Sequence, residues 1–187
     1  MVGKLLASAA VTGLLLNAAV NPARATAQDA TLVADSTFIQ TAGSLGLLQV
    51  KLGKLAQDKG SSAAVREYGK RMIEDYSKAN EQLAAGAKQA AYPAPVMLRQ
   101  HQQIYDRFQK TGRGSFDKKY MAEMVNEHGQ TVRLYQQESE HGRVTSLKQL
   151  ASTMLPTVQQ HLNLATETAG AVGADVTAAA AQDQQGS

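Results

Sequence analysis

Residues 38–56, FIQTAGSLGLLQVKLGKLA, decide the fold class of this chain. Their inward-facing positions recur in steps of four and three residues, at Phe38, Ala42, Leu45, Gln49, Leu52 and Ala56. Since an α-helix makes one turn in 3.6 residues, this spacing places all six side chains on one face of a helix. The pattern predicts an amphipathic helix, and Asp35 and Ser36 just before it are predicted to cap its amino end.

The same spacing recurs three more times and predicts three more helices. The second series follows Ser62 and comprises Val65, Tyr68, Met72, Tyr76, Ala79 and Leu83; the third comprises Met121, Met124, His128, Val132 and Tyr135; the fourth comprises Leu147, Ala151, Met154, Val158, His161, Ala165 and Thr168. Pro93 and Pro95 end the second helix and begin a longer crossover, in which residues 97–109 are expected to form a short extra helix. The chain is therefore predicted to be all-α, an up-and-down four-helix bundle with a longer crossover between helices 2 and 3.

The composition agrees with a globular helical protein and excludes several classes of site. Of 187 residues, 43% are apolar and 19% are charged, and the chain contains no cysteine. A disulfide scaffold, a thiolate metal site and a cysteine nucleophile are therefore excluded. No phosphate-binding loop, nucleophile elbow or nucleic-acid-binding motif occurs in the sequence.

The amino terminus has the pattern of a secretory signal peptide. A short basic start with Lys4 precedes an apolar run over residues 5–20, and residues 25–27, Ala-Thr-Ala, have the small-x-small form of a signal-peptidase site. Residues 23–25 form a competing cut site, and an uncleaved anchor is the alternative, although the run is shorter than the roughly 20 residues of a spanning helix.

These features predict a domain organisation and a location. We expect a signal peptide at 1–27, a polar leader at 28–34, the bundle at 35–170 and a disordered tail at 171–187. Loss of Lys4 and Arg24 with the signal peptide lowers the net charge from +3 to +1, so nucleic-acid binding is not expected. The mature chain is expected to have no transmembrane segment and to be periplasmic or secreted.

Each helical series carries one unusual residue near its middle: Gln49, Tyr76, His128 and His161. Because the midpoints of four bundled helices lie at similar depth, these side chains are predicted to meet in the core, with Asp75 placed to orient one histidine. Two explanations remain open. The cluster is either a hydrogen-bonded structural feature or a site for a divalent transition metal on His128 and His161.

Other polar residues support no further site. A ferritin-type di-iron centre needs Glu-x-x-His pairs, and Val125 and Val158 occupy the glutamate positions. Asp117 is expected to favour the dipole of its own helix, and His101 and His141 are expected at the surface.

Several motifs in order along the chain resemble an exported bacterial domain-of-unknown-function family with a ferritin-like four-helix fold, often labelled putative outer membrane protein. The motifs lie at residues 35–38, 46–56, 71–76, 116–120, 124–128 and 155–162, so the resemblance spans about 35–168. It implies a ferritin-like bundle and export, with outer-membrane association, but no established activity. Members of that family usually carry glutamate at the position of Gln49 and histidine at the position of Tyr76, so a metal site of the family would be weakened here.

The sequence therefore predicts an exported helical bundle without enzymatic activity and with no resident cofactor. Its expected role is structural, stress-related or partner-binding, through an envelope protein or through self-association. The alternative is a ferritin-like metal-binding protein with a degenerate central site.

Overall fold

The computed structural model describes residues 22–177, with side chains from residue 35 onward. Its elements are α1 (Pro22–Lys59), α2 (Ala63–Gln89), α3 (Arg99–Lys110), α4 (Arg113–His141) and α5 (Thr145–Val172). The all-α prediction is confirmed for this part of the chain. Residues 1–21 of the predicted signal peptide and residues 178–187 of the predicted tail lie outside the described residues.

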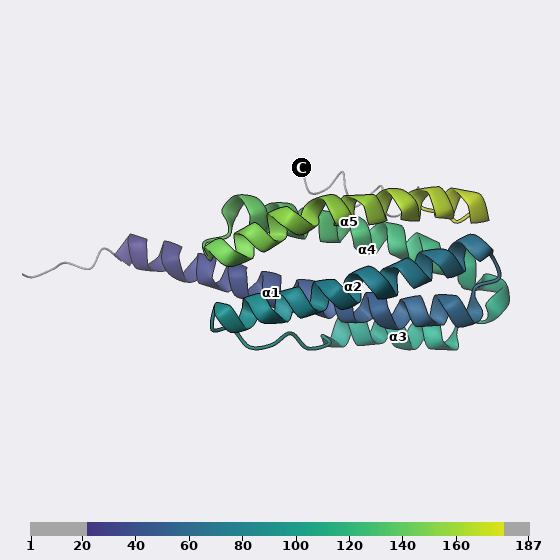
Figure 1. The fold of residues 1–187 in the computed structure, drawn as a ribbon, viewed down its shortest axis with the longest axis horizontal. Coiled ribbons are helices and arrows are strands. Elements are labelled where there is room, and N and C mark those ends of the chain that lie inside the picture. Colours follow the sequence, from purple (N-terminus) through teal and green to yellow (C-terminus); the bar gives the residue numbers. More distant parts are fainter. Residues whose placement is uncertain (1–21, 178–187) are drawn as a thin grey trace, which may run out of the picture.

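The four long helices form two hairpins, α1 with α2 and α4 with α5, which lie side by side in a bundle (Figure 1). The short helix α3 is the extra helix expected in the crossover, and it packs along α1. It begins where Ser44 Oγ accepts a hydrogen bond from the backbone N–H of Leu98, and it ends where Lys59 Nζ donates to the carbonyl of Phe108.

The direction of α3 changes the simple up-and-down order that the sequence predicted. Because α3 carries the chain along the bundle, α4 starts at the same end as α2. The carboxylate of Asp117 in α4 accepts hydrogen bonds from the backbone N–H groups of Ser61 and Ser62 before α2, at 3.0 and 2.8 Å. The helices α2 and α4 are therefore parallel, whereas the two helices of each hairpin are antiparallel.

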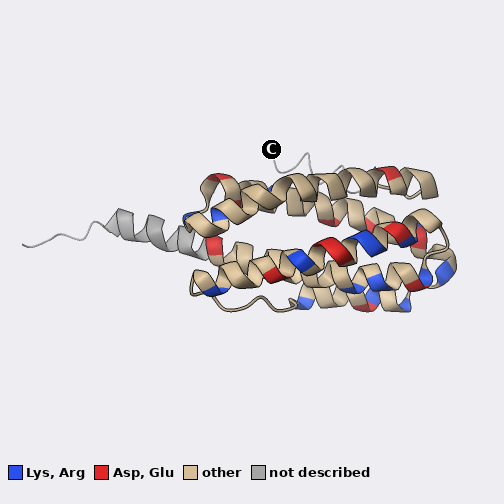
Figure 2. Ribbon diagram, in the orientation of Figure 1, with Lys and Arg blue, Asp and Glu red and all other residues tan. Residues whose placement is uncertain are grey.

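The four predicted series of inward-facing residues are confirmed as the core. Every residue of each series is buried, including the four polar or aromatic midpoints. Charged residues of both signs are mixed along α2 (Figure 2), whereas the core is mainly aliphatic and aromatic. Burial of one continuous face on each helix provides the main stabilisation of the bundle.

The first hairpin packs unusually closely at two glycines. A Cβ atom added to Gly53 in α1 would lie 2.6 Å from the backbone oxygen of Gly69 in α2, and one added to Gly69 would lie 2.8 Å from the backbone oxygen of Gly53. No side chain fits between the two backbones at this crossing. Glycine at both positions therefore lets α1 and α2 touch backbone to backbone.

The predicted cap at Asp35 is wrong. Helix α1 already begins at Pro22, a residue that suits the first helical position, and it continues through Asp35. The buried Asp35 carboxylate instead accepts hydrogen bonds from the backbone N–H groups of Arg143 and Val144, at 3.0 and 3.3 Å, just before α5. Asp35 therefore caps a helix that follows it by more than a hundred residues.

Asp117 caps the amino end of α2 in the same way, from its position in α4. We expect Asp117→Ala to lower the free energy of unfolding by about 1 kcal/mol, because the N–H groups of Ser61 and Ser62 lose their acceptor. Urea denaturation followed by circular dichroism measures this change. Glu81→Ala, which removes an exposed carboxylate of α2, is the control, and equal losses in the two variants would contradict the capping role.

Candidate functional site

The central cluster is the group Gln49, Asp75, Tyr76, His128 and His161 that the sequence singled out. Four of its side chains are fully buried, and the side chain of Asp75 is 28% exposed. The structure joins its members into two hydrogen-bonded pairs, Tyr76 with His128 and Asp75 with His161. The two imidazole rings lie at right angles with their centroids 5.7 Å apart.

His128 uses both of its ring nitrogens within the protein. Its Nδ1 lies 2.9 Å from the carbonyl oxygen of Met124, and its Nε2 lies 3.1 Å from the hydroxyl of Tyr76. Because a carbonyl only accepts, Nδ1 carries the proton and Nε2 accepts from Tyr76. His128 is therefore held as a neutral imidazole by one contact on each side of its ring.

Tyr68 belongs to this site although the sequence reasoning did not select it. Its hydroxyl lies 3.4 Å from Nδ1 of His128, on the opposite side of the ring from Tyr76. Tyr68 and Tyr76 are eight residues apart in α2, about two helical turns, so they bracket His128 from one helix face. This second tyrosine at helical spacing was the signal that could have identified it.

His161 has one satisfied and one unsatisfied ring nitrogen. Its Nε2 lies 2.8 Å from Oδ2 of Asp75, and since a carboxylate only accepts, Nε2 carries the proton. The same Asp75 oxygen accepts a hydrogen bond from Nε of Arg71 at 3.2 Å, which fixes the carboxylate. Among the described residues, Nδ1 of His161 has no hydrogen-bond partner and is left as a buried acceptor.

Burial keeps both histidines uncharged at neutral pH. Burial, together with a smaller effect of the neighbouring His161, lowers the pKa of His128 to about 3, although the hydrogen bond to the Met124 backbone opposes the shift. Burial also lowers the pKa of His161, although Asp75 acts in the opposite direction. The pKa of Tyr76 is raised well above its usual value, mainly by burial, so its hydroxyl keeps its proton.

Gln49 is buried at 1% exposure, but the structure gives it no part in these pairs. Neither its amide nitrogen nor its amide oxygen has a hydrogen-bond partner among the described residues. The two polar atoms of this buried α1 side chain are thus left without hydrogen bonds, which lowers the stability of the fold.

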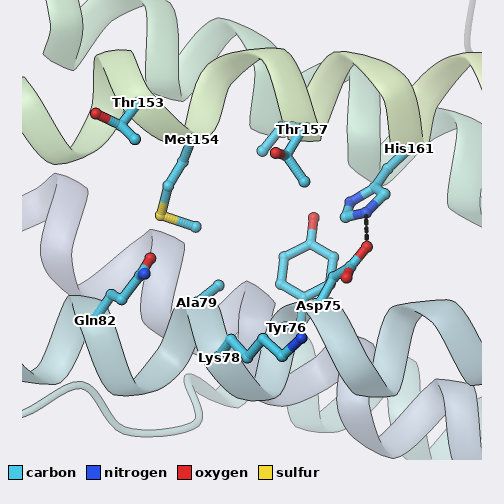
Figure 3. A pocket seen from close by; sticks show the side chains of 10 residues that line it. Asp75, Tyr76, Lys78, Ala79, Gln82, Thr153, Met154, Thr157 and His161 are labelled. Carbon is cyan, nitrogen blue, oxygen red and sulfur yellow. Dashed lines mark hydrogen bonds and ion pairs between the residues drawn. The ribbon is translucent and has the colours of Figure 1, made fainter.

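Asp75, Tyr76 and His161 also line a pocket of about 260 Å³ between α2 and α5 (Figure 3). Its buried wall consists of Tyr76, Ala79, Met154, Val158 and His161, and its rim consists of the exposed Lys78, Gln82, Thr153 and Thr157. The central cluster is therefore connected to the protein surface through this pocket, on the side of His161.

The residues present do not fit a metal centre that uses both histidines. A metal needs the lone pair of a ring nitrogen, and the lone pair of His128 already accepts the Tyr76 hydroxyl. Over the described residues, no three histidine, aspartate or glutamate side chains are arranged to share an ion.

The two remaining histidines, His101 and His141, differ in their exposure to solvent. His101 was expected at the surface, and this prediction is wrong: the residue is 4% exposed, and its Nδ1 lies 2.6 Å from the hydroxyl of Ser44. The packing of α3 against α1 buries it, which a single helix pattern does not reveal. His141, at the end of α4, is exposed as expected, with 75% of its side chain accessible.

Comparison with known proteins agrees with the motifs quoted above. The family model described as "Domain of unknown function (DUF4142)" matches residues 20–168. The chain belongs to the DUF4142 family. Its match begins before residue 35, where the motif resemblance was expected to start. No curated protein and no solved structure matches this DUF4142 chain significantly.

None of the helices in the described part of the chain combines the length and apolar character needed to cross a bilayer.

Proposed function

We propose that this DUF4142 protein is an exported, non-enzymatic helical-bundle protein that acts by binding a partner in the cell envelope. Its central cluster serves the architecture of the core. One observation carries the structural role of this cluster: both ring nitrogens of His128 are hydrogen-bonded inside the protein, to Met124 and Tyr76. The hydrogen bonds that His128 makes to Tyr76 and Met124 satisfy its ring inside the core, so this pair stabilises one arrangement of the helices and needs no ion.

We also propose that the bundle is ferritin-like. Two antiparallel hairpins joined by a crossover along the bundle support this relationship. Gln49 and Tyr76, which stand where the family usually has glutamate and histidine, then change the polar groups in the core. A tyrosine hydroxyl donates to the neighbouring histidine, whereas an additional imidazole would offer another metal ligand.

Metal analysis tests the structural role of the cluster. The full mature chain is purified without chelator and analysed for Zn, Fe, Mn and Cu, then titrated with Zn²⁺ and Cu²⁺ beside a His128→Leu/His161→Phe variant. We expect no stoichiometric metal in the purified protein and no difference between the two proteins in the titrations. One ion per chain in the wild type that is absent from the variant would reject the proposal.

A second candidate function is weak metal binding at His161 alone. It is favoured by Nδ1 of that residue, which has no partner among residues 35–177 and is the type of nitrogen that binds transition metals. A His161→Phe variant and a His128→Leu variant titrated separately distinguish this case. Loss of the ion only in His161→Phe would support it.

Export is tested by the position of the mature amino terminus. Expression of the full chain in a Gram-negative host, followed by fractionation and amino-terminal sequencing, is expected to give a periplasmic protein that begins at Gln28. A full-length chain in the membrane fraction would support the anchor instead. In vivo cross-linking in the same fractions is expected to reveal an envelope partner or self-association.

A further inference from the structure

The pocket between α2 and α5 combines an apolar floor with a polar rim (Figure 3). Ala79 and Met154 form the accessible part of the floor, since 9% and 8% of their surfaces remain exposed. A volume of about 260 Å³ lies just below the range of roughly 300–1,000 Å³ for drug-sized ligands, so the pocket suits a smaller molecule, such as part of one sugar. The rim consists of four exposed polar side chains, Lys78, Gln82, Thr153 and Thr157.

The carboxylate of Asp75 is a hydrogen-bond acceptor in this lining that solvent can reach. Its side chain is 28% exposed. Oδ2 accepts hydrogen bonds from Nε of Arg71 at 3.2 Å and from Nε2 of His161 at 2.8 Å, whereas Oδ1 accepts none from the described residues. Oδ1 is therefore open to a ligand while Oδ2 holds the carboxylate in place. The buried Nδ1 of His161 takes no part in this site.

This acceptor lies next to the apolar floor. Asp75 and Ala79 are four residues apart in α2, so they are neighbours on one helix face, with about 5–6 Å between their Cβ atoms. Thr153 and Thr157 have the same spacing in α5, on the opposite side of the pocket (Figure 3). The hydroxyl of Thr153 donates to the carbonyl of Gln149, and the hydroxyl of Thr157 makes no hydrogen bond within the described part of the chain. Both hydroxyls are therefore able to accept a hydrogen bond from a ligand.

The charges around the opening disfavour ions. Arg71 already pairs with Asp75, and Lys78 on the rim adds a second positive charge, so a cationic ligand is repelled. An anionic ligand would lie beside the Asp75 carboxylate. A purely apolar ligand would remove water from Asp75 without replacing its hydrogen bonds. The lining therefore favours a neutral ligand that carries an N–H or O–H donor next to a small apolar group.

We propose that this pocket binds the acetamido group of an N-acetylated amino sugar. The amide N–H donates to Oδ1 of Asp75, the methyl group contacts Ala79 and Met154, and the sugar hydroxyls form hydrogen bonds with Gln82 and Thr157 at the rim. In a trans amide the N–H and the methyl group lie on the same edge, which matches an acceptor placed beside an apolar surface. This inference goes beyond the proposed envelope function and does not depend on it.

NMR titration of the full mature chain with N-acetylglucosamine and with glucose tests the site. The two sugars share the same ring, and only the first carries an acetamido group. We expect N-acetylglucosamine to bind about tenfold more tightly, the equivalent of one hydrogen bond, and to shift the backbone amide resonances of Asp75, Ala79 and Thr157. Equal affinities, no binding of N-acetylglucosamine, or shifts confined to other parts of the bundle would overturn the proposal.

A free sugar and a glycan chain could both supply the acetamido group. Titration with the β-linked trimer of N-acetylglucosamine distinguishes these sources. An affinity above the statistical gain from three copies identifies a glycan chain, and an affinity at or below it identifies the free sugar. Both results support binding of the acetamido group.

Asp75→Asn tests the acceptor without removing the side chain. Because His161 and Arg71 both donate, the amide oxygen takes the place of Oδ2 and the amide nitrogen takes the place of Oδ1. A donor then faces the N–H of the ligand. We expect the affinity for N-acetylglucosamine to fall about tenfold while the helical circular dichroism signal is unchanged. Unchanged affinity in this variant would contradict the proposed role of Asp75.

Thr157→Trp tests the location of the site independently. It closes the rim at an exposed position, so it should abolish binding of N-acetylglucosamine even if Asp75→Asn fails to fold. Thr166→Trp, at an exposed position of the same helix that does not line the pocket, is the matched control and should bind normally. Binding that persists in Thr157→Trp would also overturn the proposal.

Discussion

Gly53→Val is expected to lower the free energy of unfolding by about 3 kcal/mol, the upper range for overpacking. The reason is the crossing of α1 and α2, where a Cβ on Gly53 would lie 2.6 Å from the backbone oxygen of Gly69 and 2.9 Å from the side chain of Ile73. A flexible side chain can rotate away from such a contact, whereas a backbone cannot. The two helices must therefore separate along part of their interface. Thermal and urea denaturation measure the loss.

Gly170→Val is the matched control because it makes the same substitution in a long helix. A Cβ on Gly170 would meet nothing within 4 Å, so only helix propensity changes there. Valine is better than glycine in a helix by a few tenths of a kcal/mol, so this variant should be as stable as the wild type or slightly more. If both variants lose the same stability, close packing of the first hairpin is not the cause.

His128→Leu is expected to lower the free energy of unfolding by about 2–3 kcal/mol at pH 7. Leucine has a similar size, but it accepts no hydrogen bond from the hydroxyl of Tyr76, which is 3% exposed. The contact with Tyr68 at 3.4 Å is lost as well. Each unpaired buried hydroxyl carries a desolvation cost that the unfolded chain does not have.

The stability loss caused by His128→Leu is expected to become smaller as the pH falls. The folded pKa of His128 is about 3 and its ordinary value is 6.5, so the unfolded state binds the proton more readily. The contribution of neutral His128 is fully present above pH 6.5 and decreases as the pH falls toward 3, by about 1.4 kcal/mol per unit. His128→Leu lacks this loss, so the stability difference between variant and wild type should shrink on acidification and disappear near pH 4–5.

Denaturation curves at several pH values between 4 and 7.5 measure this difference. Acidic groups elsewhere in the protein titrate in both proteins and cancel in the comparison. His141→Ala is the control, since His141 is exposed and its removal should change stability little at any pH. A difference between His128→Leu and wild type that stays constant over the whole range would show that His128 is not protected from protonation in the fold.

Much of the fold and part of the site followed from residue spacing. The steps of four and three along residues 38–56 identified a buried helix face correctly, because helical periodicity relates residues that are neighbours on one helix. The midpoints Tyr76 and His128 do meet, and Asp75 lies against His161. The roles of Asp35 and His101 were missed, since each depends on a distant partner outside its own helix, Val144 before α5 or Ser44 in α1.

The sequence by itself determined the helical class, the buried face of each long helix and the depth of the central polar residues, since all three follow from local periodicity. Only the tertiary structure decided which atoms pair within the core. It paired His128 with Tyr76, left Nδ1 of His161 and the amide of Gln49 without partners in the described part of the chain, and made α2 parallel to α4. The physical reason is that a hydrogen bond depends on distances of a few tenths of an ångström between helices, whereas periodicity specifies only the face on which a side chain lies.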